Sequence, residues 1–174
     1  MRITKRSCWR LGAATLLLTT LSCGEEHATG VVDPKTSSSS SPTLVECPTT
    51  ETRTTQAIIG PLGGTVSLGG TSIRIPLGAV TVSTLITVTV PASRFVEVDV
   101  RANDLTAFLF RTPVSVTIDY SRCNRSDIDQ APLTVWYIDS ATKELLENMG
   151  GRDDKARRRI TFETGHLSGY AIAF

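Results

Sequence analysis

Histidine is nearly absent from the chain, which has only His27 and His166 in 174 residues. Neither histidine lies near cysteines or carboxylates at the spacing of a metal site, so we expect no metal. The sequence also lacks a glycine-rich phosphate loop followed by Lys-Ser/Thr, and it lacks a Gly-x-Ser-x-Gly nucleophile elbow. These absences argue against the common metal, nucleotide and serine-hydrolase enzymes, and we expect no cofactor.

The sequence has no strong excess of charge of either sign, with 18 Lys and Arg residues against 17 Asp and Glu residues. Four of the basic residues lie within the first ten positions, so the rest of the chain is slightly acidic. Such a chain lacks the positive surface that neutralises a phosphate backbone. A nucleic-acid partner is therefore not expected.

A long apolar run is also missing, and the most apolar segment, residues 11–21, is short. It covers about 11 residues, whereas a helix that crosses a bilayer needs about 20. Basic residues precede it and the small residue Ser22 follows it, as in a cleaved export signal. The sequence therefore predicts a signal peptide over residues 1–22. The basic residues are Arg2, Lys5, Arg6 and Arg10.

The segment Thr20-Leu21-Ser22-Cys23-Gly24 resembles the lipobox of bacterial lipoproteins, although Thr20 stands where the motif usually has leucine. The resemblance implies that Cys23 is acylated and becomes the new amino terminus, so that a lipid anchor attaches the protein to a membrane. The residue after Cys23 is Gly24 rather than aspartate, and in this the segment resembles lipoproteins of the outer membrane. This implies a position at that membrane, facing the periplasm or the cell surface. The alternative is ordinary secretion with cleavage nearby.

Residues 23–45 have the composition of a flexible tether. They include the serine run 37–41 and few apolar side chains, so they cannot bury enough surface to fold. The remaining residues, 46–174, suit one compact domain with a single core.

Few cysteines remain for the folded domain. Of the four in the chain, Cys8 leaves with the leader and Cys23 is assigned to the anchor. In an oxidising compartment the other two, Cys47 and Cys123, are expected to form a disulfide, and no Cys-x-x-Cys spacing indicates redox chemistry. A pair of buried thiols is the alternative.

The domain lacks a sustained helical period, and its apolar residues alternate with polar ones. Turn residues such as Gly63-Gly64 and Gly69-Gly70 separate the alternating segments. Short strands of this kind favour an all-β fold, an antiparallel β-sandwich. The segment 144–149 is compatible with a helical turn or an irregular strand. The expected strands lie at 65–68, 72–75, 86–90, 96–100, 114–120, 133–138, 160–162 and 170–174.

Several of these segments resemble the ZU-five domain, a β-sandwich module. The similarity is carried by Gly60–Val66, Ile73–Val80, Phe110–Val116 and His166–Ala171, and it covers residues 55–174. Leu77 departs from the family pattern, which usually has a second proline there. The resemblance implies a module that binds other proteins or neighbouring domains, but it names no partner. Together with the expected export, it predicts a cell-envelope protein of unknown identity as the partner.

The segment His166-Leu167-Ser168 resembles the sites at which some adhesion-receptor and ZU-five proteins cut their own chains. The resemblance implies that the Ser168 hydroxyl attacks the Leu167 carbonyl, that His166 takes the proton, and that water hydrolyses the resulting ester. This chemistry needs a strained backbone. The alternative is that His166 and Ser168 share one face of the last strand with Tyr170 and Ile172.

Aromatic residues are scarce. Trp136 and Tyr137 point to opposite faces of one expected strand, so one should be buried and the other exposed. An exposed Trp136 is a candidate docking residue. Sandwiches also bind glycans through exposed aromatic residues, but the other tryptophan, Trp9, lies in the leader, so composition argues against this alternative.

Two charged segments are interpreted as solvated loops. Asp127 and Asp129 are expected in an exposed loop. Residues 157–159, three arginines behind Asp153 and Asp154, are expected in a charged hairpin loop, with contact to an anionic ligand as the alternative. Together, the sequence predicts a non-catalytic envelope lipoprotein whose β-sandwich is an interaction or structural module, with self-cleavage and glycan binding as alternatives.

Overall fold

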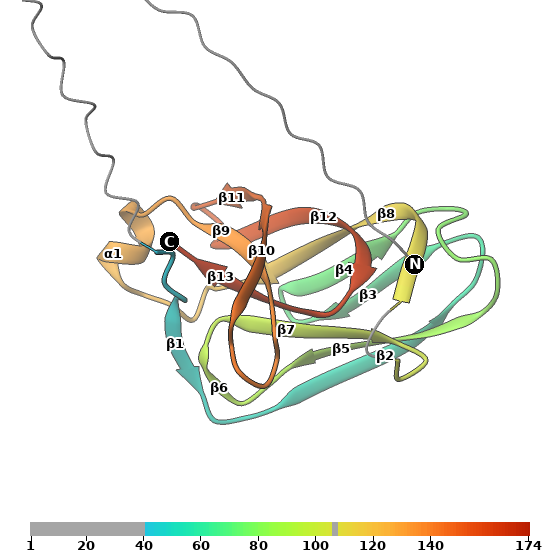
Figure 1. Cartoon of the computed structure of the whole chain (residues 1–174), viewed down its shortest axis with the longest axis horizontal. Coiled ribbons are helices and arrows are strands. Elements are labelled where there is room, and N and C mark those ends of the chain that lie inside the picture. Colours follow the sequence, from blue (N-terminus) through green and yellow to red (C-terminus); the bar gives the residue numbers. More distant parts are fainter. Residues whose placement is uncertain (1–40, 106–107) are drawn as a thin grey trace, which may run out of the picture. The chain divides into compact units, whose positions relative to one another are not determined.

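The computed structural model describes residues 41–105 and 108–174 (Figure 1). The expected signal peptide, Cys23 and the tether up to residue 40 lie outside the described residues. Within the described ranges, no helix has the length and apolar character needed to cross a membrane.

The described residues form two antiparallel sheets, which confirms the β-sandwich. The first sheet has the strand order β10-β9-β13-β7-β5-β2 and the second β11-β12-β8-β4-β3, while β1 pairs with β6 in a separate ribbon. The strands are β1 (Glu46–Thr49), β2 (Arg53–Ile59), β3 (Gly64–Leu68), β4 (Thr71–Ile75), β5 (Thr84–Val90), β6 (Ser93–Phe95), β7 (Glu97–Ala102), β8 (Phe108–Asp119), β9 (Thr134–Ile138), β10 (Leu145–Gly150), β11 (Arg152–Asp154), β12 (Arg159–Leu167) and β13 (Gly169–Ala173), and the helix is α1 (Ser126–Gln130).

The core lies between the two sheets, where alternate residues of each strand are buried. In β5, Ile86 and Val88 are at most 1% exposed, and in β8 the same holds for Val116 and Ile118. The residues between them face outward, as the period of two requires. Each fully buried aliphatic side chain stabilises the fold by about 1.5–3 kcal/mol, so this alternation fixes the register of both sheets.

The chain crosses from one sheet to the other at Ser168. β12 ends at Leu167 beside β8 in the second sheet, and β13 begins at Gly169 between β7 and β9 in the first. The expectation that His166 and Ser168 share a strand face with Tyr170 and Ile172 is therefore wrong. The sequence suggests one continuous strand because the alternation of inward-facing residues continues from β12 into β13. Both strands direct alternate residues into the same core.

The expected end of the tether at residue 45 is also wrong. Val45 is fully buried and Leu44 is 9% exposed. The Val45 N–H donates to the Ile172 carbonyl at 2.8 Å, while Thr43 and Phe174 exchange backbone hydrogen bonds of 3.0 and 3.1 Å. Residues 43–45 thus extend the first sheet beside the end of β13, and they help to bury every residue of that strand.

Four strands were not predicted from the sequence. They are β1, β2, β6 and β11, which are short or lie at a sheet edge. Residues 145–150 form β10, an irregular strand with two register shifts against β9, so the helical alternative for 144–149 is wrong. Asp127 and Asp129 lie in the single turn of α1 rather than in a loop, although both are exposed.

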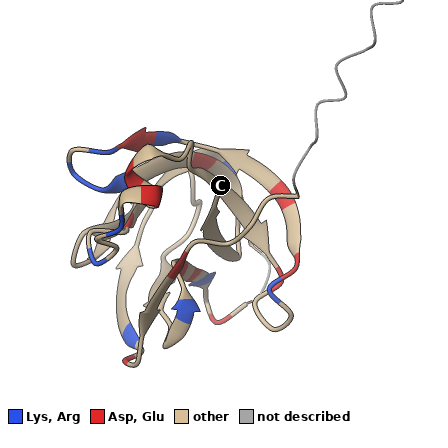
Figure 2. Ribbon diagram, turned by 90° about the vertical axis from the view of Figure 1, so that its left-hand side faces the viewer, with Lys and Arg blue, Asp and Glu red and all other residues tan. Residues whose placement is uncertain are grey.

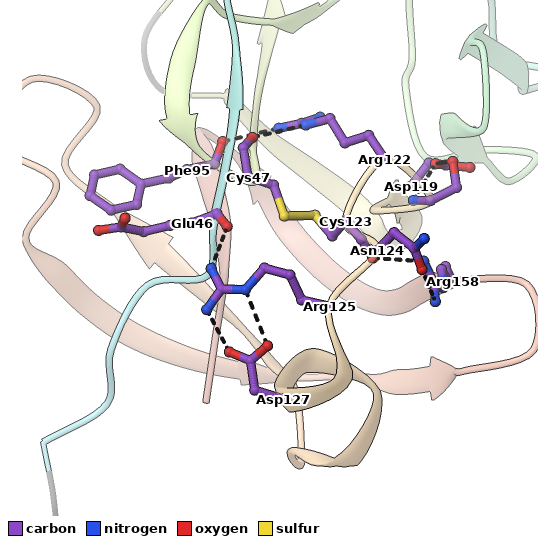
Figure 3. Close-up of a disulfide and its surroundings, with 11 residues drawn as sticks. Glu46, Cys47, Phe95, Asp119, Arg122, Cys123, Asn124, Arg125, Asp127 and Arg158 are labelled. Carbon is purple, nitrogen blue, oxygen red and sulfur yellow. Dashed lines mark hydrogen bonds and ion pairs between the residues drawn. A yellow bond between two sulfur atoms is a disulfide. The ribbon is translucent and has the colours of Figure 1, made fainter.

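The predicted disulfide is confirmed. Cys47 on β1 and Cys123 in the loop after β8 are bonded, with their Cα atoms 5.6 Å apart and 76 positions apart in sequence (Figure 3). Both residues are buried. The bond joins the start of the domain to the end of its longest strand.

Candidate functional site

One end of the sandwich exposes a set of large aliphatic side chains, here called the apolar end. At this end β2, β4 and β7 finish and β3, β5 and β8 begin. Six of the eight exposed large hydrophobic residues in the described part of the chain lie here, with exposures of 54–85%. They are Ile58, Leu62, Leu77, Val82, Leu105 and Leu109.

Backbone hydrogen bonds hold the loops of the apolar end together, on the right-hand side of Figure 1. The Gly78 N–H donates to the Pro61 carbonyl at 2.8 Å, which joins the β2–β3 and β4–β5 loops. The Asn103 N–H donates to the Leu85 carbonyl at 2.8 Å, which fixes the turn after β7 against β5. Leu62, Leu77, Val82 and Leu105 are therefore presented by loops that brace one another. Ile58 and Leu109 lie at the adjoining ends of β2 and β8.

Gly63 shows how tightly two of these loops pack. Its φ is +75°, and a Cβ at this position would lie 2.3 Å from the Ile75 carbonyl oxygen. Only glycine fits such a left-handed turn at this separation. The Gly-Gly-Thr motif thus brings the turn with Leu62 against the loop with Leu77.

The opposite end, here called the disulfide end, carries charge. Figure 2 views the sandwich from this side and shows acidic and basic segments on α1 and the β11–β12 hairpin. Each of the three consecutive arginines of the hairpin has a carboxylate partner: Arg157 pairs with Asp154, Arg158 with Asp129 and Arg159 with Asp119. The expected charged hairpin is confirmed, and its arginines bind the protein's own acids.

Two loops at the disulfide end are held by arginines (Figure 3). Arg125 donates to the Glu46 carbonyl at 3.2 Å and pairs with Asp127 at 2.6 Å. Arg158 donates to the carbonyl of Cys123 at 2.7 Å. These bonds tie the loop after β8 to β1 and to the β11–β12 hairpin, around the disulfide.

A cavity of about 350 Å³, here called the arginine pocket, lies at this end between the two sheets. Arg53 comes from the start of β2, Arg122 from the loop after β8, and Arg159 from the start of β12, with Asp119 beside them. The β3–β4 turn closes one side, where a Cβ on Gly70 would lie 1.7 Å from an Asp119 carboxylate oxygen. The pocket holds three positive charges and one negative charge.

The structure separates the side chains of the suggested self-cleavage segment. The His166 ring lies on β12, and its Nδ1 is 3.3 Å from the Tyr170 hydroxyl. Among the hydrogen bonds of residues 41–105 and 108–174, none joins this ring to Ser168. Ser168 itself lines a different cavity, with Asp99, Arg101 and Tyr137. Self-cleavage between Leu167 and Ser168 stays a prediction, which the intact mass of the purified chain can test.

The residues around His166 form a buried hydrogen-bond network. The Tyr170 hydroxyl donates to the His166 carbonyl and lies 3.1 Å from the Thr164 hydroxyl, which donates to the same carbonyl at 2.9 Å. Tyr170 is fully buried. The network thus fixes the last turn of chain before the crossing between sheets.

Alkaline pH should weaken the fold through this network. Burial raises the pKa of Tyr170 from 10.0 to about 12. The unfolded chain therefore loses the proton first, so the stability from the neutral hydroxyl is complete below pH 10 and is lost as pH rises to about 12, roughly 2–3 kcal/mol in all. Urea unfolding of the wild type and of Tyr170→Phe at successive pH values should show a shallower decline for the variant. Equal declines would contradict this.

Trp136 is half-buried rather than exposed. It packs with Leu44, Phe95 and Leu145 on the outer side of the first sheet, and its indole N–H donates to Thr134 Oγ1 at 3.1 Å. Tyr137 is also half-buried and packs on the main core. The expected division into one buried and one exposed aromatic is wrong, because residues 43–45 and β10 cover the outer side.

In the part of the chain that the structure describes, no group of three or more His, Cys, Asp and Glu side chains is arranged to hold a metal ion. Comparison with known proteins finds no matching family model and no similar curated protein. The ZU-five resemblance accordingly stays a prediction from the motifs.

Proposed function

We propose that this chain is an exported, lipid-anchored β-sandwich of the ZU-five kind that binds a protein of the cell envelope through its apolar end. The leader and the lipobox-like segment at Cys23 support export and anchoring. The disulfide is compatible with an oxidising compartment. The observation that carries the proposal is the concentration of exposed aliphatic side chains on the loops and strand ends at one end of the sandwich.

Exposed apolar side chains gathered in one place usually mark an interaction surface. Leu62, Leu77 and Leu109 are 85%, 74% and 80% exposed. Burying one such side chain against a partner contributes about 1.5–3 kcal/mol before the costs of association. Exposed Asp104 and Arg111 lie beside these loops, so the surface has an apolar centre with a polar rim of both signs, as protein interfaces do.

The composition of the apolar end favours a protein over a lipid surface. Surfaces that dock on bilayers usually add tryptophan, tyrosine and lysine to their aliphatic residues. The six exposed side chains are all aliphatic. The two lysines of the described residues, Lys143 and Lys155, are already paired with Glu97 and Asp153.

The point at which the described chain begins suits this role. Thr43, near the start of the described chain, is hydrogen-bonded to Phe174, which follows β13 at the disulfide end. The apolar loops lie at the other end of the strands. A lipid anchor upstream of residue 41 would therefore be joined to the domain at the end opposite the apolar end.

Aspartate at Leu62 and Leu77 together should reduce partner binding by about 30-fold or more, because each change places a charge in the centre of the interface. A photo-cross-linking residue at Val82, in the native envelope, would measure capture of the partner in wild type and variant. Leu146→Asp is the matched control, since Leu146 is 46% exposed but lies on β10.

The expected result is one cross-linked protein that disappears in the double variant and persists in the control. Thermal unfolding should change little in either variant, because these side chains are exposed. Cross-links to lipid alone, or equal loss of the cross-link in the control, would overturn the proposal.

A further inference from the structure

We propose that the arginine pocket binds a phosphate monoester. The pocket lies at the disulfide end, opposite the apolar loops, so a ligand there and a protein at the apolar end can be bound together. Its lining residues come from both sheets and from the loop that the disulfide holds.

The arginines of the cavity outnumber its carboxylates. Arg159 is neutralised by Asp119, to which its Nε donates at 3.0 Å. Arg53 and Arg122 have no carboxylate partner among the ion pairs of the described residues. The Arg122 guanidinium instead donates to two neutral acceptors, the carbonyls of Cys47 at 3.0 Å and Phe95 at 3.1 Å. Two guanidinium groups that line the cavity therefore lack a directly paired carboxylate, and in this sense their charges are uncompensated.

The protein's own electrostatics reflect this imbalance. Desolvation of the guanidinium and the neighbouring charge of Arg53 lower the pKa of Arg122, and the more weakly acting charges of Asp119 and Glu97 oppose this change without cancelling it. Arginine nevertheless stays charged at neutral pH, so the two guanidinium groups repel each other. An anion between them would relieve that repulsion.

Asp119 forms no ion pair with Arg53 or Arg122, and its carboxylate is held by other groups on the wall of the pocket. Although desolvation opposes it, hydrogen bonds from Ser121 and Arg159 lower the pKa of Asp119. One carboxylate oxygen accepts from the Ser121 N–H at 2.9 Å and from its hydroxyl, and the other accepts from Arg159. The carboxylate is thus engaged on the wall, against Gly70, and leaves the cavity free.

The pocket also offers unused donors. In the described residues, Nη1 of Arg122, both Nη atoms of Arg159 and the whole guanidinium of Arg53 have no hydrogen-bond acceptor. Guanidinium groups bind phosphate oxygens through paired N–H donors, and such charge-assisted bonds are about twice as strong as neutral ones. Free N–H donors on three separate arginines suit a group with three or four acceptor oxygens better than a planar carboxylate.

The charge of the ligand follows from the same count. A phosphate monoester carries a charge of about −1.5 to −2 at pH 7, which matches the two uncompensated guanidinium charges. A carboxylate or a phosphate diester would neutralise only one of them. The position of Arg122 depends on Cys47, because its Nε is bonded to that residue's carbonyl.

The test is calorimetric titration of the purified processed protein with inorganic phosphate and with glycerol 3-phosphate at low salt. Arg53→Gln should weaken binding of both by about tenfold or more, since it removes one of two uncompensated charges. Arg53 is exposed and has no described partner, so the variant should fold. Arg74→Gln is the matched control, because Arg74 is exposed and unpaired but lies on β4 outside the pocket.

Vesicles of phosphatidylcholine with and without phosphatidic acid distinguish a lipid headgroup from a soluble phosphate. Binding of either source that falls in Arg53→Gln and is unchanged within about twofold in Arg74→Gln supports the site. Arg122→Lys should also weaken it, since lysine keeps the charge but lacks the fork. No binding by the wild type in any arm, or equal losses in Arg53→Gln and Arg74→Gln, overturns the proposal.

Discussion

Replacing Cys47 and Cys123 together by alanine is expected to lower the free energy of unfolding by about 2–5 kcal/mol. The bond closes a loop with a sequence separation of 76, so its loss restores much conformational freedom to the unfolded chain. The folded state also loses its clamp between β1 and the loop after β8. Equilibrium unfolding in urea would measure the change as a lower midpoint.

Reducing agent provides the control for this experiment. It should destabilise the wild type by a similar amount and leave the double alanine variant unchanged. If the disulfide carries no stability, the variant and the wild type will unfold within about 0.5 kcal/mol of each other, and reducing agent will have no effect on either.

The second large effect should come from Lys143→Met, with a loss of about 3 kcal/mol. Lys143 pairs at 2.6 Å with Glu97, whose side chain is only 4% exposed on the outer side of the first sheet. Removing the lysine leaves a buried carboxylate without a counter-charge, and such a group is costly. Thermal or urea unfolding at neutral pH would show the loss.

Two further variants distinguish the loss of the counter-charge of Glu97 from a nonspecific loss of stability. The double variant Lys143→Met with Glu97→Leu should recover most of the stability, because both charges then leave the apolar surroundings. Arg94→Met breaks the exposed pair with Glu46 and should cost less than about 1 kcal/mol. A single Lys143→Met variant as stable as Arg94→Met would show that Glu97 does not depend on its partner.

The central strands could be predicted from the sequence because each buries one face. β5 alternates throughout and β8 alternates from Val114 onward, with Ile86, Val88, Val116 and Ile118 on the inner side. β2 could not be read in this way. Its sequence, Arg-Thr-Thr-Gln-Ala-Ile-Ile, lies on the edge of the first sheet, where most side chains are at least partly exposed and the apolar signal is weak.

Contacts between segments far apart in sequence explain why the burial of Glu97, Leu44 and Val45 was not predicted. Glu97 alternates with Val96 and Val98, so the pattern places it outside, yet the turn after β9 covers it and supplies Lys143. Leu44 and Val45 follow a run of serine and proline residues, and only their pairing with β13 brings them into the fold. Composition over a window cannot show such pairing.

The two candidate sites differ in how far they could be predicted from the sequence. Leu62 and Leu77 each stand between a proline and a glycine in a turn, outside the alternating segments that supply most of the core. The exposure of these two leucines at the apolar end could therefore be predicted from the sequence. The arginine pocket has no such signal, because Arg53, Arg122 and Arg159 are scattered along the chain and meet only through the pairing of the strands.

The pairing of residues 43–45 with the end of β13 has a mechanical consequence. A pull on the amino terminus loads the hydrogen bonds between Thr43 and Phe174 first. Peeling can proceed only to Cys47, where the covalent link passes the force to Cys123 and so into the interior of the molecule. Under a pulling force applied at residue 41, the domain would therefore lose only a few residues from the sheet edge before the disulfide carries the load.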